Sequence, residues 1–199
     1  VTDHHLPGEI RPEADAICNP QLGACLLPPG EQGPVPMLAD REEDPFGFQY
    51  LAGVGVVFHL MAAVNRMLHR DPIDMRPFLD LVALGTLADV VPLKGQNRIL
   101  AKNGLLLVAE GKRPGLAALK EAAGYAVDAP LGAGQVSFQL APRINACGRI
   151  GRVMSALELL LTRDPQRARE LAEEADRTNN RRKEQDQLLK EEAIAMALP

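Results

Sequence analysis

The first strong pattern of apolar positions lies in residues 50–70. Its apolar side chains recur every three or four residues, which is the period of a helix with a buried face. They are Leu51, Val54, Val57, Phe58, Met61, Val64 and Leu68. The pattern predicts a buried helix, and the small residues Gly53 and Gly55 would let a neighbouring element approach it closely.

A second apolar stretch, residues 75–93, is nearly continuous until it reaches Asp89. Pro77 stands where the first turn of a helix tolerates proline, and Pro92 stands where the helix has already ended. We therefore expect a fully buried helix that ends near Asp89. A strand across residues 80–84 is the alternative, because a short apolar run fits both structures.

The central part of the chain predicts two shorter helices and one extended segment. Residues 97–124 contain two helical patterns separated by the sequence EGKRPG, whose glycine and proline break the period. Residues 136–151 alternate apolar and polar side chains before a Pro-Arg-Ile-Asn sequence. This alternation predicts a short strand or extended segment that leads into a functional loop.

The C-terminal part of the chain predicts one long helix over residues 165–197. Asp164 is a favourable N-cap and Pro165 a favourable first helical residue. At 1.5 Å per residue this helix would be about 50 Å long. Its middle, residues 177–187, is polar on all sides, which is typical of a helix that connects two domains or crosses open solvent.

Composition narrows the class of protein. Apolar residues make up 46% of the 199 residues, so the chain can bury a core, and no apolar stretch is long enough to span a membrane or resembles a signal peptide. We therefore expect a cytoplasmic protein with reduced cysteines. Residues 20–48 contain six prolines, four glycines and an acidic cluster, which predicts an irregular exposed loop.

The net charge of −4 argues against a general nucleic-acid binder, but this charge is unevenly distributed. Residues 1–50 carry two basic and nine acidic side chains, whereas residues 143–183 carry ten basic and six acidic side chains. A local basic face of this kind can hold a phosphate backbone on an acidic protein.

Asp3, His4 and His5 are candidate metal ligands. Imidazole and carboxylate groups together suit a divalent ion such as manganese or zinc. The β-branched pair Val1-Thr2 resembles the end of a strand, where neighbouring side chains point to opposite faces. Both histidines can therefore serve one site only where the strand becomes a loop. A surface turn or a tag remnant is the other interpretation.

Two further sets of residues are candidates for chemistry. Asp89 lies in an apolar run, and a buried carboxylate needs compensation by a metal, an ion pair or a helix-terminal hydrogen bond. The sequence APRINACGRIG contains Arg143, Asn145 and Arg149. Arginine binds phosphate through a planar, bidentate fork, although a structural loop explains this sequence as well.

Four segments together resemble the RecJ family, bacterial single-stranded-DNA-specific exonucleases of the DHH phosphoesterase superfamily. They are VTDHHLPGEIRPEADAICNP, YLAGVGVVFHL, DLVALGTLADVVPLKGQNRIL and APRINACGRIG. The resemblance implies an α/β fold with a parallel sheet and flanking helices. It also implies metal-dependent 5′-to-3′ hydrolysis of single-stranded DNA in repair and recombination, with single-strand-binding protein and a helicase as partners and no membrane.

The same resemblance implies roles for the candidate residues. Enzymes of this kind bind two divalent cations, manganese or magnesium, which stabilise charge on the attacking and leaving sides of the phosphodiester. His4 and Asp89 match metal-ligand positions. His5 matches a position close to the scissile phosphate, and Asp3 one that orients the histidines. The block that lines the nucleic-acid path contains Arg143, Asn145 and Arg149.

Some parts that the resemblance implies are missing from the given sequence. An Asp-x-Asp cluster and a further aspartate should precede the DHH segment, and a domain with a Gly-Gly-His motif should follow the long helix. We therefore interpret residues 1–160 as the C-terminal portion of a DHH catalytic domain and residues 161–199 as a long connecting helix. Such a fragment would be inactive alone, because half of a two-metal site cannot position both ions.

Two other functions stay open on the sequence. One is a DHH phosphodiesterase that acts on short oligonucleotides or cyclic dinucleotides, because the DHH triplet occurs in those enzymes too. The other is a non-catalytic DHH-like scaffold that binds nucleic acid. The presence of Asp3, His4, His5 and Asp89 counts against the scaffold.

Overall fold

The computed structural model describes most of the chain, in two compact units. The described residues are 1–8, 10, 12–22, 24–25, 35–36, 47–149 and 153–197. Unit 1 comprises Val1–Leu106 and unit 2 comprises Leu107–Pro199. Most of the loop predicted over 20–48 lies outside the described residues.

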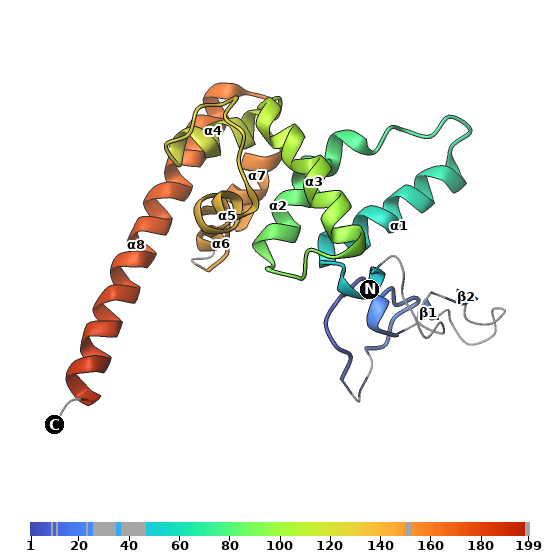
Figure 1. Cartoon of the computed structure of the whole chain (residues 1–199), viewed down its shortest axis with the longest axis horizontal. Helices are drawn as coiled ribbons and strands as arrows, with labels where there is room; N and C mark the ends of the chain where they lie inside the picture. The colour runs from blue at the N-terminus through green and yellow to red at the C-terminus, as the bar shows by residue number, and fades with distance from the viewer. Residues whose placement is uncertain are drawn as a thin grey trace. The chain divides into compact units, whose positions relative to one another are not determined.

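Unit 1 contains three main helices, which Figure 1 labels α1 (Gly53–Leu68), α2 (Leu79–Ala88) and α3 (Gly95–Glu110). The last turn of α3 belongs to unit 2. The helices predicted within 50–70 and 75–93 are confirmed, and α2 covers the residues for which a strand was the alternative. Asp89 is the C-cap of α2, so the predicted end of that helix is confirmed as well.

The core of unit 1 forms where α1, α2 and α3 meet. Leu51, Val56, Val82 and Leu100 are buried together, with Phe58 among the partly buried side chains that pack against them. α2 and α3 approach closely at a glycine of α3, and a Cβ at Gly104 would overlap the carbonyl of Leu79.

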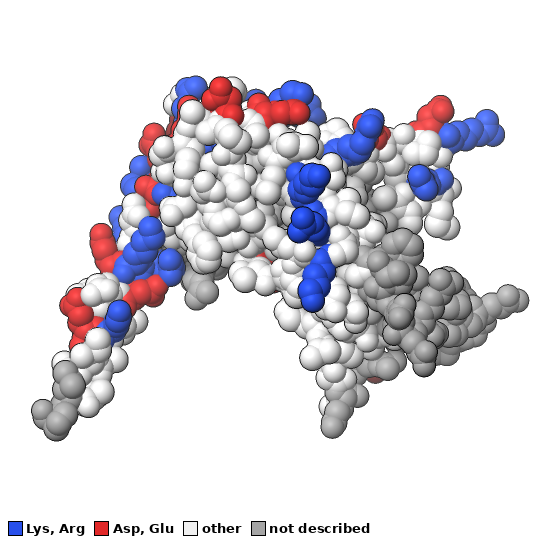
Figure 2. Space-filling model, in the orientation of Figure 1, with Lys and Arg blue, Asp and Glu red and all other residues white. Residues whose placement is uncertain are grey.

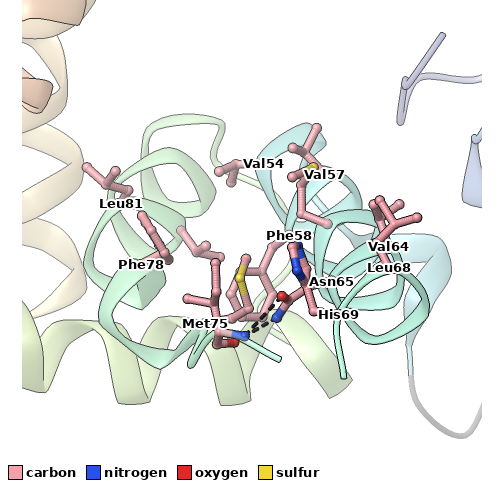
Figure 3. A pocket seen from close by; sticks show the side chains of 13 residues that line it. Val54, Val57, Phe58, Val64, Asn65, Leu68, His69, Met75, Phe78 and Leu81 are labelled. Carbon is pink, nitrogen blue, oxygen red and sulfur yellow. Dashed lines mark hydrogen bonds between the residues drawn. The ribbon is translucent and has the colours of Figure 1, made fainter. Parts of the chain in front are cut away.

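α1 is less buried than its apolar pattern predicts. Leu60, Met61 and Leu68 remain 37%, 48% and 74% exposed. Part of this face lines an apolar groove of about 550 Å³ together with α2 and the segment that joins the two helices (Figure 3). Asn65 crosses the groove, donating from Nδ2 to the Ile73 carbonyl at 2.7 Å and accepting the Ile73 N–H at 3.0 Å. Periodicity identifies an apolar face, but only packing shows what covers it.

β-Structure is sparse among the described residues. Thr2 and Cys18 form one parallel bridge, in which the Cys18 N–H donates to the Val1 carbonyl at 2.8 Å. The strands β1 (Ala24–Cys25) and β2 (Val35–Pro36) pair antiparallel. The described residues therefore show only isolated bridging where the resemblance implies a parallel sheet.

Unit 2 is helical and packs around the first half of α8 (Pro165–Ala197), as Figure 1 shows. The helices in contact with α8 are α4 (Pro114–Ala122), α6 (Ala141–Arg149) and α7 (Val153–Leu161). α3 and α4 confirm the two helices predicted over 97–124. α4 and α7 meet so closely that a Cβ at Gly115 would overlap the carbonyl of Leu159.

The extended segment predicted over 136–151 is wrong for its described residues, 136–149. The short helix α5 (Ala133–Gln135) continues through a π-helical turn, Val136–Leu140, into α6. Burial follows a helical period, with Val136, Leu140 and Cys147 all inside the unit. The polar residues between these buried positions produce the alternation of apolar and polar side chains that is typical of a strand. Pro142 is the second residue of α6, in the first turn after the π-helical segment, where a residue without an N–H is tolerated.

α8 has the predicted bounds and is capped by Asp164, whose Oδ1 accepts the N–H of Gln166 at 2.9 Å. Its last buried residue is Asn179, and residues 183–197 are all exposed on a rod that projects from unit 2 (Figure 1). The division of the chain at residues 160–161, which falls within unit 2, stays a prediction. No helix in the described part of the chain has the length and apolar character to cross a membrane.

The charged side chain of Lys120 is fully buried in unit 2. Lys120 donates from Nζ to the carbonyls of Val108 at 3.0 Å, of Ala129 at 2.9 Å and of Val127. Burial lowers the pKa of Lys120, and nearby Asp128 opposes that shift. The ammonium group thereby joins the end of α3 to the turn that follows α4.

We predict that Lys120→Met lowers the free energy of unfolding by about 3 kcal/mol, because three buried carbonyls lose their donor. Urea titration measures this, with exposed Lys112→Met as the control, which should cost less than about 0.5 kcal/mol. Above the lowered pKa that Lys120 has in the folded state, the unfolded chain binds more protons at this residue than the folded chain does. The parent should therefore gain stability relative to Lys120→Met as the pH rises from that value towards the unfolded-state pKa. Equal losses of unfolding free energy in Lys120→Met and Lys112→Met would contradict the prediction.

Candidate functional site

The fold of unit 1 brings together two predicted metal ligands that lie far apart in the sequence. Nε2 of His4 is 3.3 Å from Oδ2 of Asp89. The His4 side chain is only 17% exposed, and that of Asp89 is 37% exposed. An imidazole nitrogen and a carboxylate oxygen therefore face one another at a partly open position, as two ligands of a shared cation do.

Each of these side chains stands at the end of a structural element. His4 follows the bridge between Thr2 and Cys18, and its ring packs against the first turn of α1. A Cβ at Gly53 would lie 3.3 Å from Cδ2 of His4, so the glycine admits the imidazole. Asp89 caps α2, with its N–H donating to the Gly85 carbonyl at 3.0 Å.

Asp3 shapes the turn that carries the two histidines. Its Oδ1 accepts the N–H of His4 at 2.8 Å and the Nδ1 of His5 at 2.8 Å. The hydrogen bond from the His5 ring, followed by the backbone N–H groups, lowers the pKa of Asp3. The two imidazole centroids are 4.2 Å apart, because the backbone turns here instead of continuing as a strand. His5 is largely exposed, and Asp3 partly so.

Sequence reasoning missed Asn97, which supports this site from within unit 1. Asn97 is fully buried on α3 and donates from Nδ2 to the Tyr50 carbonyl and to the Pro92 carbonyl at 3.1 Å. It thereby ties the chain beyond Asp89 to the segment that leads into α1. The available signal was a polar side chain at a helical interval from the buried Leu100 and Ala101.

The backbone directly after Asp89 adopts an uncommon conformation. Val90 has a φ of 57°, in the left-handed region, which β-branched residues rarely occupy. Such a conformation costs about 1–3 kcal/mol and persists where surrounding contacts impose it. Here the chain leaves α2 in the direction that brings the Pro92 carbonyl to Asn97.

The third predicted set, which comprises Arg143, Asn145 and Arg149, lies on α6 in unit 2. Arg143 is 7% exposed, and both its Nε, at 2.9 Å, and its Nη2, at 2.8 Å, lie next to Oδ1 of Asp176. Its other N–H groups donate to the carbonyls of Gln139 and, at 3.4 Å, Ala122. Asn145 is exposed. The described contacts therefore join α6 to α8 through Arg143.

Phosphate binding by the α6 residues stays a prediction. The guanidinium of Arg143 already has protein partners, which favours a structural role for this residue. The side chain of Arg149 lies outside the described residues. The predicted basic face over 143–183 is also partly neutralised, because Arg167, Arg177 and Arg182 each pair with a carboxylate.

A structural role for Arg143 predicts that Asp176→Asn lowers the free energy of unfolding by about 2–4 kcal/mol, because a buried cation loses its counter-ion. Chemical denaturation of the chain measures this. Asp186→Asn is the matched control: Asp186 pairs with Arg182 at the exposed surface of α8, and its loss should cost less than about 1 kcal/mol. An undiminished stability in Asp176→Asn would exclude the structural role.

The sequence is similar to that of known exonucleases over nearly its whole length. It is 41% identical over 207 residues to the single-stranded-DNA-specific exonuclease RecJ of Salmonella typhimurium, covering 98% of the chain and 32% of that protein. It is 38% identical over 199 residues to RecJ of Thermus thermophilus, covering 100% of the chain and 25% of that protein. The chain thus spans about a third or less of these relatives. No family model matches it.

The fold is similar to that of solved RecJ structures. RecJ of Thermus thermophilus in complex with Mn²⁺ superimposes with a TM-score of 0.74 at 36% identity, covering 100% of the chain and 26% of that structure. An exonuclease RecJ bound to manganese gives a TM-score of 0.76 at 36% identity, covering 99% of the chain and 44% of that structure.

Proposed function

Because the chain belongs to the RecJ family, we propose that it forms part of a metal-dependent exonuclease that degrades single-stranded DNA from the 5′ end. The observation that carries this proposal is the convergence of His4 Nε2 and Asp89 Oδ2, at 3.3 Å. The C-terminal end of α2 meets the residues that follow the β-bridge at this point. Two metal-binding groups at such a junction support a catalytic role.

The residues of this pair fit a divalent cation of the manganese or magnesium class. One imidazole nitrogen and one carboxylate oxygen provide two donors, and neither has a competing basic partner in the described part of the chain. No group of three or more His, Cys, Asp or Glu suited to a metal occurs among the described residues. Further ligands would therefore have to come from residues beyond those described.

Bound divalent ions would supply an activated water and stabilise charge on the phosphodiester. The residues of this chain would hold and orient them. His4 and Asp89 would be direct ligands. His5, which is exposed next to His4, would approach the scissile phosphate, and Asp3 would hold the turn through its bonds to His4 and His5.

The remaining parts of the proposal rest on the similarity of the chain to RecJ. We propose that the bridge between Thr2 and Cys18 belongs to a parallel sheet, that the exposed half of α8 connects two domains, and that Asn145 and Arg149 lie near the nucleic-acid path. A cytoplasmic enzyme of repair and recombination would work beside single-strand-binding protein and a helicase. Two donors alone do not position two ions, so we expect negligible nuclease activity from the 199-residue chain.

We predict that His4→Ala or Asp89→Ala lowers the manganese-dependent hydrolysis of single-stranded DNA by about a hundredfold or more, because each removes a metal ligand. The variants are made in a protein of full RecJ length that carries this chain, and release of nucleotides from labelled DNA is measured. His69→Ala and Asp71→Ala, both exposed in unit 1, are the matched controls and should retain activity. Near-parental rates in either site variant would refute the assignment.

A further inference from the structure

We propose that a row of basic side chains at the start of α3, formed by Lys94, Arg98 and Lys102, binds the phosphate backbone of single-stranded nucleic acid. This inference rests on the proposed function, because it names a surface by which the same enzyme would hold its substrate. The three residues, called the α3 row below, are four positions apart. Lys94 directly precedes the first residue of α3, and the other two residues lie within the helix. At this spacing the row follows one side of the helix at intervals of about 6 Å.

The α3 row is exposed and carries an uncompensated charge. All three residues are exposed, and none forms an ion pair with a carboxylate in the part of the chain that the structure describes. Figure 2 shows basic side chains along the N-terminal half of α3 with no acidic side chain between them. On a chain with a net charge of −4, such a row is a local positive surface that favours a polyanion.

Several other arginines and lysines of the chain form ion pairs with carboxylates. Arg76 pairs with Asp74 at 2.9 Å, Lys112 with Glu110 at 2.8 Å, and Arg167 with Glu158 at 2.6 Å. Those pairs reduce the charge available to a ligand. The α3 row thus keeps its full charge, whereas the stretch 143–183, in which sequence composition predicts a basic face, loses part of its own.

The α3 row lies in the same unit as the candidate metal site, and four residues of chain separate Asp89 from Lys94. Lys94 lies on the short connection that starts at Asp89, and its Nζ is 5.7 Å from the centroid of the Tyr50 ring. The carbonyl of Tyr50 accepts a hydrogen bond from Asn97, and Gly53, a few residues on, contacts His4. Of the three residues, Lys94 is the nearest to Asp89 in the sequence, so the proposal has a strand held at His4 and Asp89 meet Lys94 first.

The geometry of the α3 row suits a single strand. Cations about 6 Å apart along a straight helix face match an extended row of phosphates, which is recognised by charge without regard to base sequence. Ile99 and Leu106, which are 53% and 61% exposed on the same helix, offer apolar surface to sugars and bases. An acidic peptide would use the charge as well, so it forms a separate arm of the test.

The test uses a protein of full RecJ length that carries this chain, with EDTA present so that binding is measured without hydrolysis. Affinity for a fluorescent oligothymidylate is measured by anisotropy over a series of salt concentrations. In the triple variant Lys94→Gln, Arg98→Gln, Lys102→Gln, the slope of log affinity against log salt should fall by about 2, because each phosphate contact to a single strand contributes about 0.7.

Two control variants separate the α3 row from charge and from folding. Arg66→Gln, Arg70→Gln, Lys112→Gln removes the same charge from other positions and should leave the slope within error of the parent. Lys94→Arg, Lys102→Arg keeps the charge and should retain the parental slope. Circular dichroism of each variant verifies that the helices are intact.

Three results would overturn the inference: an unchanged slope in the triple α3 variant, an equal loss of slope in the control triple, or equal competition by polyglutamate at matched charge. The last result would assign the α3 row to acidic polypeptides. These outcomes are independent of the proposed nuclease, whose failure appears as metal-dependent hydrolysis that survives His4→Ala and Asp89→Ala. A loss of slope in the triple α3 variant, with intact hydrolysis in those two variants, would keep the α3 row and reject the metal site.

Discussion

The amide of Asn97 holds together the two segments on which the candidate site is built. Its Nδ2 reaches the Tyr50 carbonyl ahead of α1 and the Pro92 carbonyl beyond α2. A buried donor with two backbone acceptors tolerates little displacement, because an acceptor left without its donor costs about 1–3 kcal/mol. The chain between Asp89, which faces His4, and Pro92 also contains the strained turn at Val90.

In unit 2, charged side chains take the role that the Asn97 amide has in unit 1: they are buried donors that bond to groups on different segments. Lys120 saturates three carbonyls around the end of α3, and Arg143 joins α6 to α8 through Asp176. Small residues complete the packing, since the carbonyl of Leu159 occupies the space above Gly115. Polar groups inside both units therefore specify which segments meet, while apolar burial supplies most of the stabilisation.

The two proposals assign metal binding and strand binding to different kinds of surface. The His4 and Asp89 pair is small, partly buried and built at element ends, which suits ligands that must keep one geometry. The α3 row is exposed and made of long side chains, which suits a backbone that must slide past. Both lie in unit 1, linked through Tyr50 and Asn97.

Local sequence determined most of the helices. α8 begins at Pro165 behind Asp164, and α2 ends at Ala88 before Asp89, because capping and proline act within a few residues. Residue chemistry also identified His4 and Asp89 as potential ligands, since few other side chains bind divalent ions. The alternation over 136–151 misled because polar residues on a partly buried helix imitate a strand, and only packing against α8 decides between them.

Tertiary structure alone decided which of the candidate groups meet. The 3.3 Å contact of His4 with Asp89 depends on the crossing of elements that are distant in sequence. So does the pairing of Arg143 with Asp176, which gives a candidate phosphate ligand a carboxylate partner inside unit 2. Composition gives the number of charged residues in a stretch of chain. A carboxylate that folding brings next to a basic side chain neutralises its positive charge. The α3 row keeps its charge because folding pairs none of its three cations with an acid among the described residues.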